Sequence, residues 1–256
     1  MPEALDALTK SLLQAATKAG ADAADAMAIT ASSVSIEVRG GALEQAERSE
    51  GTDIGLRVFV GHRSANVSAS DTSSRTIDEM AERAVAMARE APEDPYSGLA
   101  DPDQLSARRD AEGLELCDPT PEPSPETLQD DAARAEAAAL AVKGVSQVQS
   151  AGAGYGAQEI YLAATNGFEG GYARSERGLS CVAIAGSGTG MERDYDGDSR
   201  IFQADLRDAG DIGARAGERA LARLGARKPP TGSYPVLFDE RIAASLIGHL
   251  LGAING

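Results

Sequence analysis

Side chains suited to metal binding or nucleophilic catalysis are few and scattered in this 256-residue sequence. It contains two histidines, His62 and His249, and two cysteines, Cys117 and Cys181, with no CxxC pair. A catalytic zinc ion normally takes three protein ligands, and a nucleophilic Ser or Cys needs a base within reach. Two distant histidines, neither with a Glu at helical spacing, meet neither requirement. The residues alone therefore predict no catalytic site and no metal site in this chain.

Two glycine-rich stretches have a glycine spacing similar to that of phosphate-binding loops. Such a loop needs a strand before the glycines and, after them, a helix whose N–H groups face the phosphate. Neither stretch is followed by a helical apolar pattern or by a Lys-Ser/Thr pair, so we interpret both as loops or bulges. The two stretches are Gly152, Gly154 and Gly156, and Gly186, Gly188 and Gly190.

Three aspartates, Asp194, Asp196 and Asp198, alternate like the first ligands of a calcium loop. That loop requires Gly at its sixth position and Glu at its twelfth, and this sequence has neither there. A polar hairpin is therefore the better prediction for this segment.

The charge balance argues against direct nucleic-acid binding. The chain carries 40 acidic and 24 basic residues, a formal net charge of −16. Its densest basic stretch, from Arg215 to Lys228, has the four-residue spacing of one solvated helix face rather than of a phosphate-binding patch. No run approaches the ~20 apolar residues of a membrane span, and the N-terminus lacks a signal-peptide pattern. We expect a soluble protein of the cytoplasm, with no direct nucleic-acid or membrane partner.

The first hundred residues show the pattern of a helix, several strands and a second helix. Apolar residues at helical spacing predict both helices; Gly20 ends the first, and a capping-box Glu79 opens the second. Between them, apolar and polar residues alternate as in half-buried strands. The predicted strands cover residues 34–38, 42–48, 54–60 and 66–70, with turns at Gly40-Gly41 and Gly61-His62, and the helices cover 2–18 and 76 onward.

The same order repeats in the second half. Ser124-Pro125 predicts the start of a helix and Gly144 its end, while Asn166-Gly167 is a strong hairpin signal. Alternating segments predict strands, and a second amphipathic helix follows them. The predicted strands cover residues 145–152, 158–165, 168–175, 179–185 and 201–206, and the last helix covers 211–224.

Seven of the eleven prolines lie between residues 91 and 125, mixed with Asp and Glu, which indicates an extended connection. We therefore predict an α+β protein built from two successive helix–antiparallel sheet–helix units, consistent with an old duplication. The units occupy residues 1–100 and 124–228, and a Pro/acidic linker covers 101–123.

A further domain is expected to begin after the second unit. Residues 236–238 have the pattern of a short strand, and residues 242–254 that of an apolar helix, which needs a partner surface. We expect residues 229–256 to be the truncated start of this third domain.

Several stretches, separated along the chain, match the pattern of one protein family. They are residues 51–60 and 94–101, Met191-Glu192-Arg193-Asp194-Tyr195, residues 220–224 continuing through Arg227-Lys228 into Tyr234-Pro235-Val236-Leu237-Phe238, and residues 248–256. In these stretches, in the same order and over nearly its whole length, the chain resembles the TldD/PmbA family. Members of that family are described as modulators of DNA gyrase.

The resemblance implies a role in the TldD/TldE metalloprotease, which acts on small or unfolded peptides. In the TldD type, one helix carries His-Glu, three residues and a second His; the histidines bind the metal and the Glu activates its water. Aligned on His249, this chain has Ala244 at the first ligand position and Ser245 at the general-base position. Ala has no donor atom, and a Ser hydroxyl is a poor base near neutral pH. This departure predicts a noncatalytic TldE/PmbA-type subunit, whose substrate-binding residues the sequence does not identify.

The resemblance also implies partners. We expect zinc in a TldD-like subunit, joined to this chain in a heterodimer or a larger assembly, and no cofactor in this chain. Its own contribution would be to bind an unfolded or extended peptide, which could pair with exposed strand edges. In isolation the chain could form a homodimer. The alternative function is a non-proteolytic interaction protein that modulates a toxin, an antitoxin or a gyrase-linked factor.

Overall fold

The computed structural model describes residues 4–254, which separate into two compact units. The described residues up to Leu224 form unit 1, a six-stranded antiparallel sheet with four α-helices. The described residues from Gly225 onward form unit 2, whose helix is α5 (Glu240–Ile254). Within residues 4–254, no helix combines the length and apolar character needed to cross a membrane.

The sheet of unit 1 joins both halves of the sequence. Its strand order is β3-β2-β1-β4-β5-β6, so β1 pairs with β2 on one side and with β4 on the other. The α+β class is therefore confirmed, with one continuous sheet shared by the two predicted units. The strands are β1 (Ala23–Arg39), β2 (Ala42–Val60), β3 (Arg63–Ala69), β4 (Val145–Ala164), β5 (Glu169–Ala185) and β6 (Glu192–Arg200).

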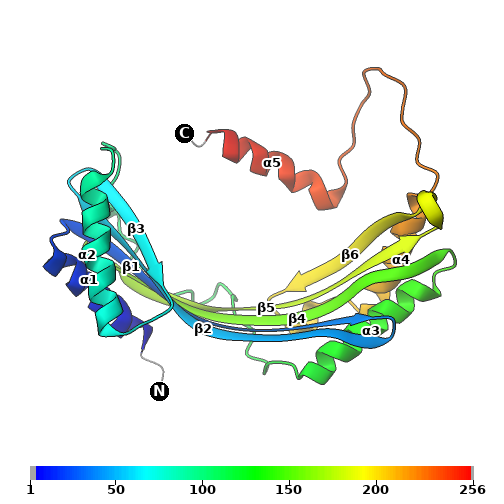
Figure 1. Ribbon diagram of the computed structural model, residues 1–256, viewed down its shortest axis with the longest axis horizontal. Coiled ribbons are helices and arrows are strands. Elements are labelled where there is room, and N and C mark those ends of the chain that lie inside the picture. Colours follow the sequence, from blue (N-terminus) through cyan, green and yellow to red (C-terminus); the bar gives the residue numbers. More distant parts are fainter. Residues whose placement is uncertain (1–3, 255–256) are drawn as a thin grey trace. The chain divides into compact units, whose positions relative to one another are not determined.

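Two helix pairs cover the two ends of this curved sheet (Figure 1). The buried residues of β1 have even numbers beneath both pairs, and strand side chains alternate between faces. Both pairs therefore cover the same face of β1, which we call the helix face, and we call the other the open face. The helices are α1 (Leu5–Ala19) and α2 (Ser74–Glu90) at one end, and α3 (Pro125–Ala141) and α4 (Ala209–Ala222) at the other.

Three predicted breaks between strands do not exist. Residues 42–48 and 54–60 belong to the single strand β2, and the four segments predicted between 145 and 185 form only β4 and β5. The loop interpretation of the glycines at 152, 154 and 156 was therefore wrong, because all three lie inside β4 without a positive φ. Glycine has a low preference for strands, but hydrogen bonds to β1 on one side and to β5 on the other keep this glycine-rich segment of β4 extended.

Two predicted strands are also absent. Residues 201–206 contain a short 3₁₀ turn, Gln203–Asp205, and residues 236–238 have no regular structure. In the first case Leu206 packs against the core beneath α3 and α4, so its apolar character reflects burial rather than strand pairing. The expected start of the first helix at residue 2 lies outside the described residues, and α2 begins at Ser74, two residues before its predicted start.

The predicted hairpin turns are confirmed. Gly40 and Gly41 have φ values of 63° and 74°, which suit glycine, and they join β1 to β2. At the turn between β4 and β5, the Asn166 side chain accepts a hydrogen bond from Phe168 N at 3.1 Å. The glycine-rich stretch 186–190 forms a loop between β5 and β6, as predicted.

The connection between the two halves lies along the first part of β5. The carbonyl of Arg109 accepts from Gly171 N at 3.2 Å, and that of Leu116 accepts from Ser175 N at 3.1 Å. A Cβ at Gly170 would lie only 2.4 Å from the Arg109 oxygen, so this close approach requires glycine. The connection is therefore attached to the sheet; the domain limits at 100 and 124 remain predictions.

Candidate functional site

A trough runs along β4 on the open face of the sheet. At three alternate positions, Gly152, Gly154 and Gly156, β4 has no side chain. The residues beside these glycines on β1 and β5 are Ser or Glu, except for Gly178, which lies beside Gly154. Gly152, for example, lies between Glu37 of β1 and Ser180 of β5. The missing side chains leave a hollow of about 620 Å³ that also borders β6.

The packing of unit 1 does not demand glycine throughout the trough floor. A Cβ at Gly156 would come no closer than 3.9 Å to a neighbouring atom, and one at Gly152 no closer than 3.6 Å, both ordinary contacts. Glycine inside a strand costs roughly 0.5–1 kcal/mol relative to Ala. Such positions often mark a place where another backbone or a ligand approaches the strand closely.

The charged side chains that line the trough are all acidic. They are Glu37 and Glu176, and no Lys, Arg or His is among the residues that line it. Asp198 also borders the hollow, but it is paired in register with the buried Leu179, so its side chain lies on the helix face. Asp198 pairs with Arg200 and Arg207, whereas neither glutamate forms an ion pair within residues 4–254. The Glu37 side chain leans over the floor, its Cγ 3.6 Å from where a Cβ on Gly152 would lie.

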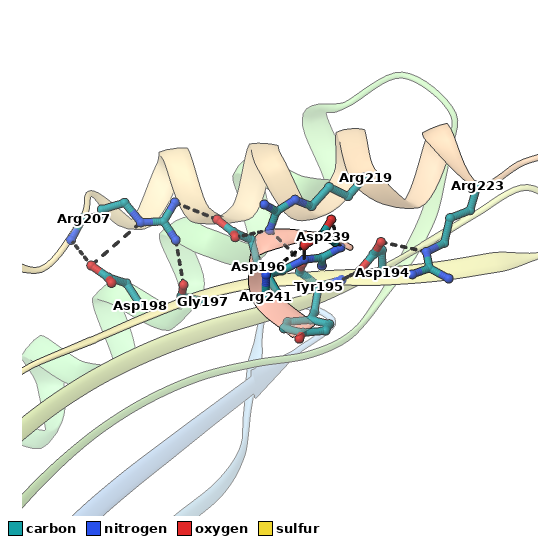
Figure 2. Close-up of polar contacts among 10 residues, drawn as sticks. All are labelled: Asp194, Tyr195, Asp196, Gly197, Asp198, Arg207, Arg219, Arg223, Asp239 and Arg241. Atoms are coloured by element: carbon teal, nitrogen blue, oxygen red, sulfur yellow. Dashed lines mark hydrogen bonds and ion pairs between the residues drawn. The ribbon is translucent and has the colours of Figure 1, made fainter. Parts of the chain in front are cut away.

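The three alternating aspartates lie on β6, in a hairpin with β5, and meet arginines of α4 and of the residues just before and after it (Figure 2). The 2.7 Å pair between Arg223 and Asp194 involves a nearly buried carboxylate, as do the pairs of Asp196 with Arg207 and Arg219. The hydrogen bond to Asp196 raises the pKa of Arg207. The interpretation of the basic stretch as a solvated helix face was therefore wrong for Arg219, whose side chain is largely buried, whereas Arg223 pairs with Asp194 and stays exposed.

Arginine side chains also donate hydrogen bonds to backbone carbonyls of β6. The Gly197 carbonyl accepts from Arg207 Nη2 at 2.7 Å, and the Tyr195 carbonyl accepts from Arg219 Nη1 at 3.4 Å. These carbonyls are not available to a further strand, which blunts the β6 edge. Within residues 4–254, by contrast, no hydrogen bond reaches the outer edge of β3 from residue 65 to 69. Of the two outer strands, β3 is the one whose edge suits strand addition.

Buried charged groups on the helix face hold the trough region in place. Arg177, 3% exposed, pairs with Asp131 of α3 at 2.6 Å and donates to the Gly154 carbonyl at 3.0 Å, beneath the trough floor. Burial lowers the pKa of Arg177, and the charge of Asp131 opposes that shift. Glu136 of α3 accepts from Gly40 N at 2.6 Å and from the next amide at 2.8 Å.

Sequence reasoning missed these buried charges, because no local motif marks them. It also missed the trough, although one signal was present: glycine at every second position of a strand pattern empties one face. The buried Cys181, whose pKa burial raises to about 12, lies on the helix face of β5 against α3. Cys117 and His62 are exposed, the latter at the turn before β3.

The positions matched to the family's metal motif all lie on α5, in unit 2. Ala244, Ser245 and His249 are exposed, and the Ser245 hydroxyl donates to the Ile242 carbonyl at 2.6 Å. These three side chains do not fit a metal ion, because Ala has no donor atom and one imidazole remains. In residues 4–254, no three His, Cys, Asp or Glu side chains are grouped closely enough to hold a metal ion.

Two family models match this chain, one in each of the two helix–sheet–helix segments that the sequence predicts. Residues 24–88 match the model of PmbA/TldA metallopeptidase domain 1, and residues 118–224 match that of the PmbA/TldA metallopeptidase central domain. The metalloprotease PmbA of Escherichia coli O157:H7 is 33% identical over 92% of this chain and 52% of its own length. A PmbA homologue of Haemophilus influenzae is 31% identical over 95% of the chain and 53% of its own length. The chain thus spans about half the length of these curated relatives.

Solved structures share the fold. A proposed modulator of DNA gyrase from Bacteroides thetaiotaomicron superposes with a TM-score of 0.84 at 24% identity, over 98% of this chain and 57% of that one. TldE from Thermococcus kodakarensis superposes with a TM-score of 0.67 at 17% identity, over 84% of this chain and 47% of that one. With two consecutive domains matched and relatives above 30% identity, this chain belongs to the PmbA/TldD metallopeptidase family.

Proposed function

We propose that this chain is the noncatalytic, TldE/PmbA-like part of a TldD/TldE-type metalloprotease. The observation that carries the proposal is the pair Ala244 and Ser245 on α5, where the family resemblance implies a metal-binding His and a general-base Glu. A methyl group cannot coordinate a metal, and the Ser245 hydroxyl already donates to a backbone carbonyl. Relatives above 30% identity are named PmbA, which agrees with this subunit type.

In this proposal the chemistry belongs to the partner. Peptide hydrolysis needs an activated water, a stabilised oxyanion and a proton donor for the leaving amine, and a metal–Glu site can supply them. A TldD-like subunit with the intact motif would hold the zinc. This chain would contribute contacts to that subunit and a surface for an extended peptide.

The trough along β4 supports the peptide-binding part of the proposal. Its floor exposes strand backbone, and together with an adjoining hollow it extends from Ala31 to Glu37 of β1. At about 3.4 Å per residue, that stretch matches roughly six residues of extended peptide. The outer edge of β3 offers a second place for an extended segment, by strand addition.

The test is reconstitution with a TldD-type relative that has the His-Glu-three-residues-His motif. The chain, the relative and their mixture are assayed for cleavage of a fluorogenic unfolded peptide, with and without a chelator, and complex formation is followed by gel filtration. We expect no cleavage by the chain alone, a complex in the mixture, and chelator-sensitive cleavage faster than that of the relative alone. Elemental analysis of the purified chain should show far less than one zinc per chain.

Chelator-sensitive cleavage by the chain alone, free of contaminating protease, would overturn the proposal. Complex formation without faster cleavage would contradict it in another way, and would favour the alternative of a non-proteolytic interaction protein. A matched control replaces both Ala244 with Ser and Ser245 with Ala, which changes the motif positions without adding a metal ligand. Its behaviour should equal that of the unaltered chain.

A further inference from the structure

The charged side chains that line the trough are all negative, and this charge favours an occupant with positive charges. Glu37 and Glu176 lie on the two strands that flank β4 and form the acidic walls of the trough. Elsewhere in unit 1, Asp194 and Asp196 of β6 and Asp131 of α3 are neutralised by arginines. The two wall glutamates form no ion pair within the described part of the chain; Glu37 is partly buried, and Glu176 is exposed and accepts a hydrogen bond from the Ser199 hydroxyl.

We infer that the trough binds an extended peptide segment carrying basic side chains, with Lys or Arg facing Glu37 and Glu176. The inference rests on the proposed peptide-binding function and adds the chemical class of the segment. Lys and Arg donate charge-assisted hydrogen bonds to carboxylates, which are stronger than neutral ones. An acidic segment would instead place like charges together in a site that has no cation among its lining residues.

The geometry also restricts the segment's side chains over the floor. Since β4 presents only backbone at Gly152, Gly154 and Gly156, a peptide backbone can approach closely where small residues face the floor. In an extended peptide alternate side chains point to opposite sides. Small residues therefore face β4, and basic residues near the ends of the segment reach the walls. The adjoining hollow of about 240 Å³ contains Arg174, so the cation-binding part ends at Glu176.

The experiment measures binding of three fluorescein-labelled ten-residue peptides by fluorescence anisotropy. All have the same Ala/Gly/Ser background, with three Lys, three Glu or no charged residue. We expect the Lys peptide to bind most tightly and to weaken as salt is raised, because partly exposed charge pairs are screened. Glu37→Gln and Glu176→Gln should each weaken its binding about three- to fivefold, as expected for ion pairs that remain partly hydrated.

Two further variants separate the trough from the general negative charge of the chain. Glu82→Gln removes an exposed carboxylate from α2 and should leave binding unchanged. Gly156→Val adds a side chain to the floor where a Cβ has ordinary clearance, and it should weaken binding of all the peptides. Unfolding midpoints verify that each variant is folded, and the nearly isosteric Gln variants test the inference if the Val variant does not fold.

Equal binding of the Lys and Glu peptides would overturn the inference, as would unchanged binding of the Lys peptide to the double Glu37→Gln, Glu176→Gln variant. If such results came together with partner-dependent, chelator-sensitive cleavage, the proposed function would stand and only the basic preference would be wrong. If the Lys peptide bound as expected but a TldD-type relative gave no faster cleavage, the basic preference of the trough would stand and the proposed function would be wrong.

Discussion

The two helix pairs of unit 1 cover one sheet but pack on it by different means. Beneath α1 and α2 the core contains large flexible or branched side chains, among them Leu8, Leu12, Ile77 and Met80. Beneath α3 and α4 the helices present mainly Ala and Gly, and the region adds the buried charges of Asp196 and Arg177. Both ends have an apolar core, and the α3/α4 end adds close backbone approach between its helices and paired charges.

This difference indicates where each end tolerates change. Large side chains can repack around a small change in volume, so the α1/α2 end should absorb conservative substitutions. At the α3/α4 end a Cβ on Gly213 would lie 1.9 Å from the Ala135 carbonyl oxygen, and backbone cannot move aside as a side chain can. The end that carries the trough is therefore the less tolerant one.

The largest expected effect comes from Gly213→Ala. The added methyl group forces α3 and α4 apart, and we expect a loss of about 3 kcal/mol in the free energy of unfolding, at the upper end for overpacked cores. Urea unfolding followed by circular dichroism measures it. The matched control is Gly248→Ala in α5, where nothing lies within 4 Å of the added Cβ. Unfolding of unit 1 should not change in the control, and a tolerated Gly213→Ala would contradict the comparison.

Asp196→Asn should have the next largest effect. Asp196 is 4% exposed and pairs with Arg207 and Arg219, so neutralising it removes a buried negative charge that two partly buried guanidinium groups share. We expect a loss of about 2 kcal/mol, less than for a fully buried pair because both arginines can reach water. Glu79→Gln on α2, which removes an exposed pair with Arg75, should cost no more than about 0.5 kcal/mol. Equal losses in the two variants would show that the β6 pairs contribute little.

Met80→Leu probes the tolerant end. Met80 is 2% exposed in the core beneath α2, and the two side chains have similar volumes. We expect a change below about 1.5 kcal/mol in the free energy of unfolding, since such swaps allow repacking. If thermal and urea unfolding showed a loss larger than that of Gly213→Ala, the proposed difference between the two ends would be reversed.

The smallest expected effect concerns pH and Asp208, which begins α4. Its carboxylate accepts from Gly210 N and pairs with Arg134 of α3, and the bond to Arg134 lowers its pKa below the ordinary 3.8. A lowered pKa stabilises the folded state above pH ~4, and this contribution disappears as the pH falls through the folded-state pKa. Because the Asp208 side chain is half exposed, we expect less than about 1 kcal/mol.

Asp208→Asn isolates that contribution. Asn is also a good helix N-cap, so the variant loses the charge and keeps the cap. The difference in unfolding free energy between wild type and variant should be present at pH 6 and should shrink steadily from pH 4 towards pH 3. A constant difference over this range would show that the charge of Asp208 is not its cause.

Local patterns predicted the elements more accurately than their connections. Ser124 caps α3 through its side chain, and Asn166-Gly167 forms its hairpin, because both signals act within a few residues. The lengths of β2, β4 and β5 could not be predicted, because their glycine and polar stretches stay extended only through neighbouring strands. The single sheet depends on the pairing of β1 with β4, which no local pattern encodes.

For the candidate site, the sequence identified the positions that match the metal motif but did not identify the trough on the sheet. The residues matched to the metal motif lie on a helix, as predicted, and their role remains a prediction. The trough depends on which face of β4 the helices cover, and that follows from the buried partners of Ala151 and Ala153 rather than from the glycines. Arg219 was misread because helical spacing predicts a common face without predicting whether a strand lies opposite.

The central pairing of β1 with β4 has a consequence for how the chain folds. Ala24 N donates to the Thr165 side chain across 141 residues of sequence, and Glu136 reaches the turn amide of Gly40 across 96. Contacts so distant in sequence require long loops to close before they contribute stability, so folding should be slow for a protein of this size. Until they form, the edge of β1 that β4 will cover is unprotected. During synthesis, the N-terminal half must therefore avoid aggregation until the residues of β4 have been made.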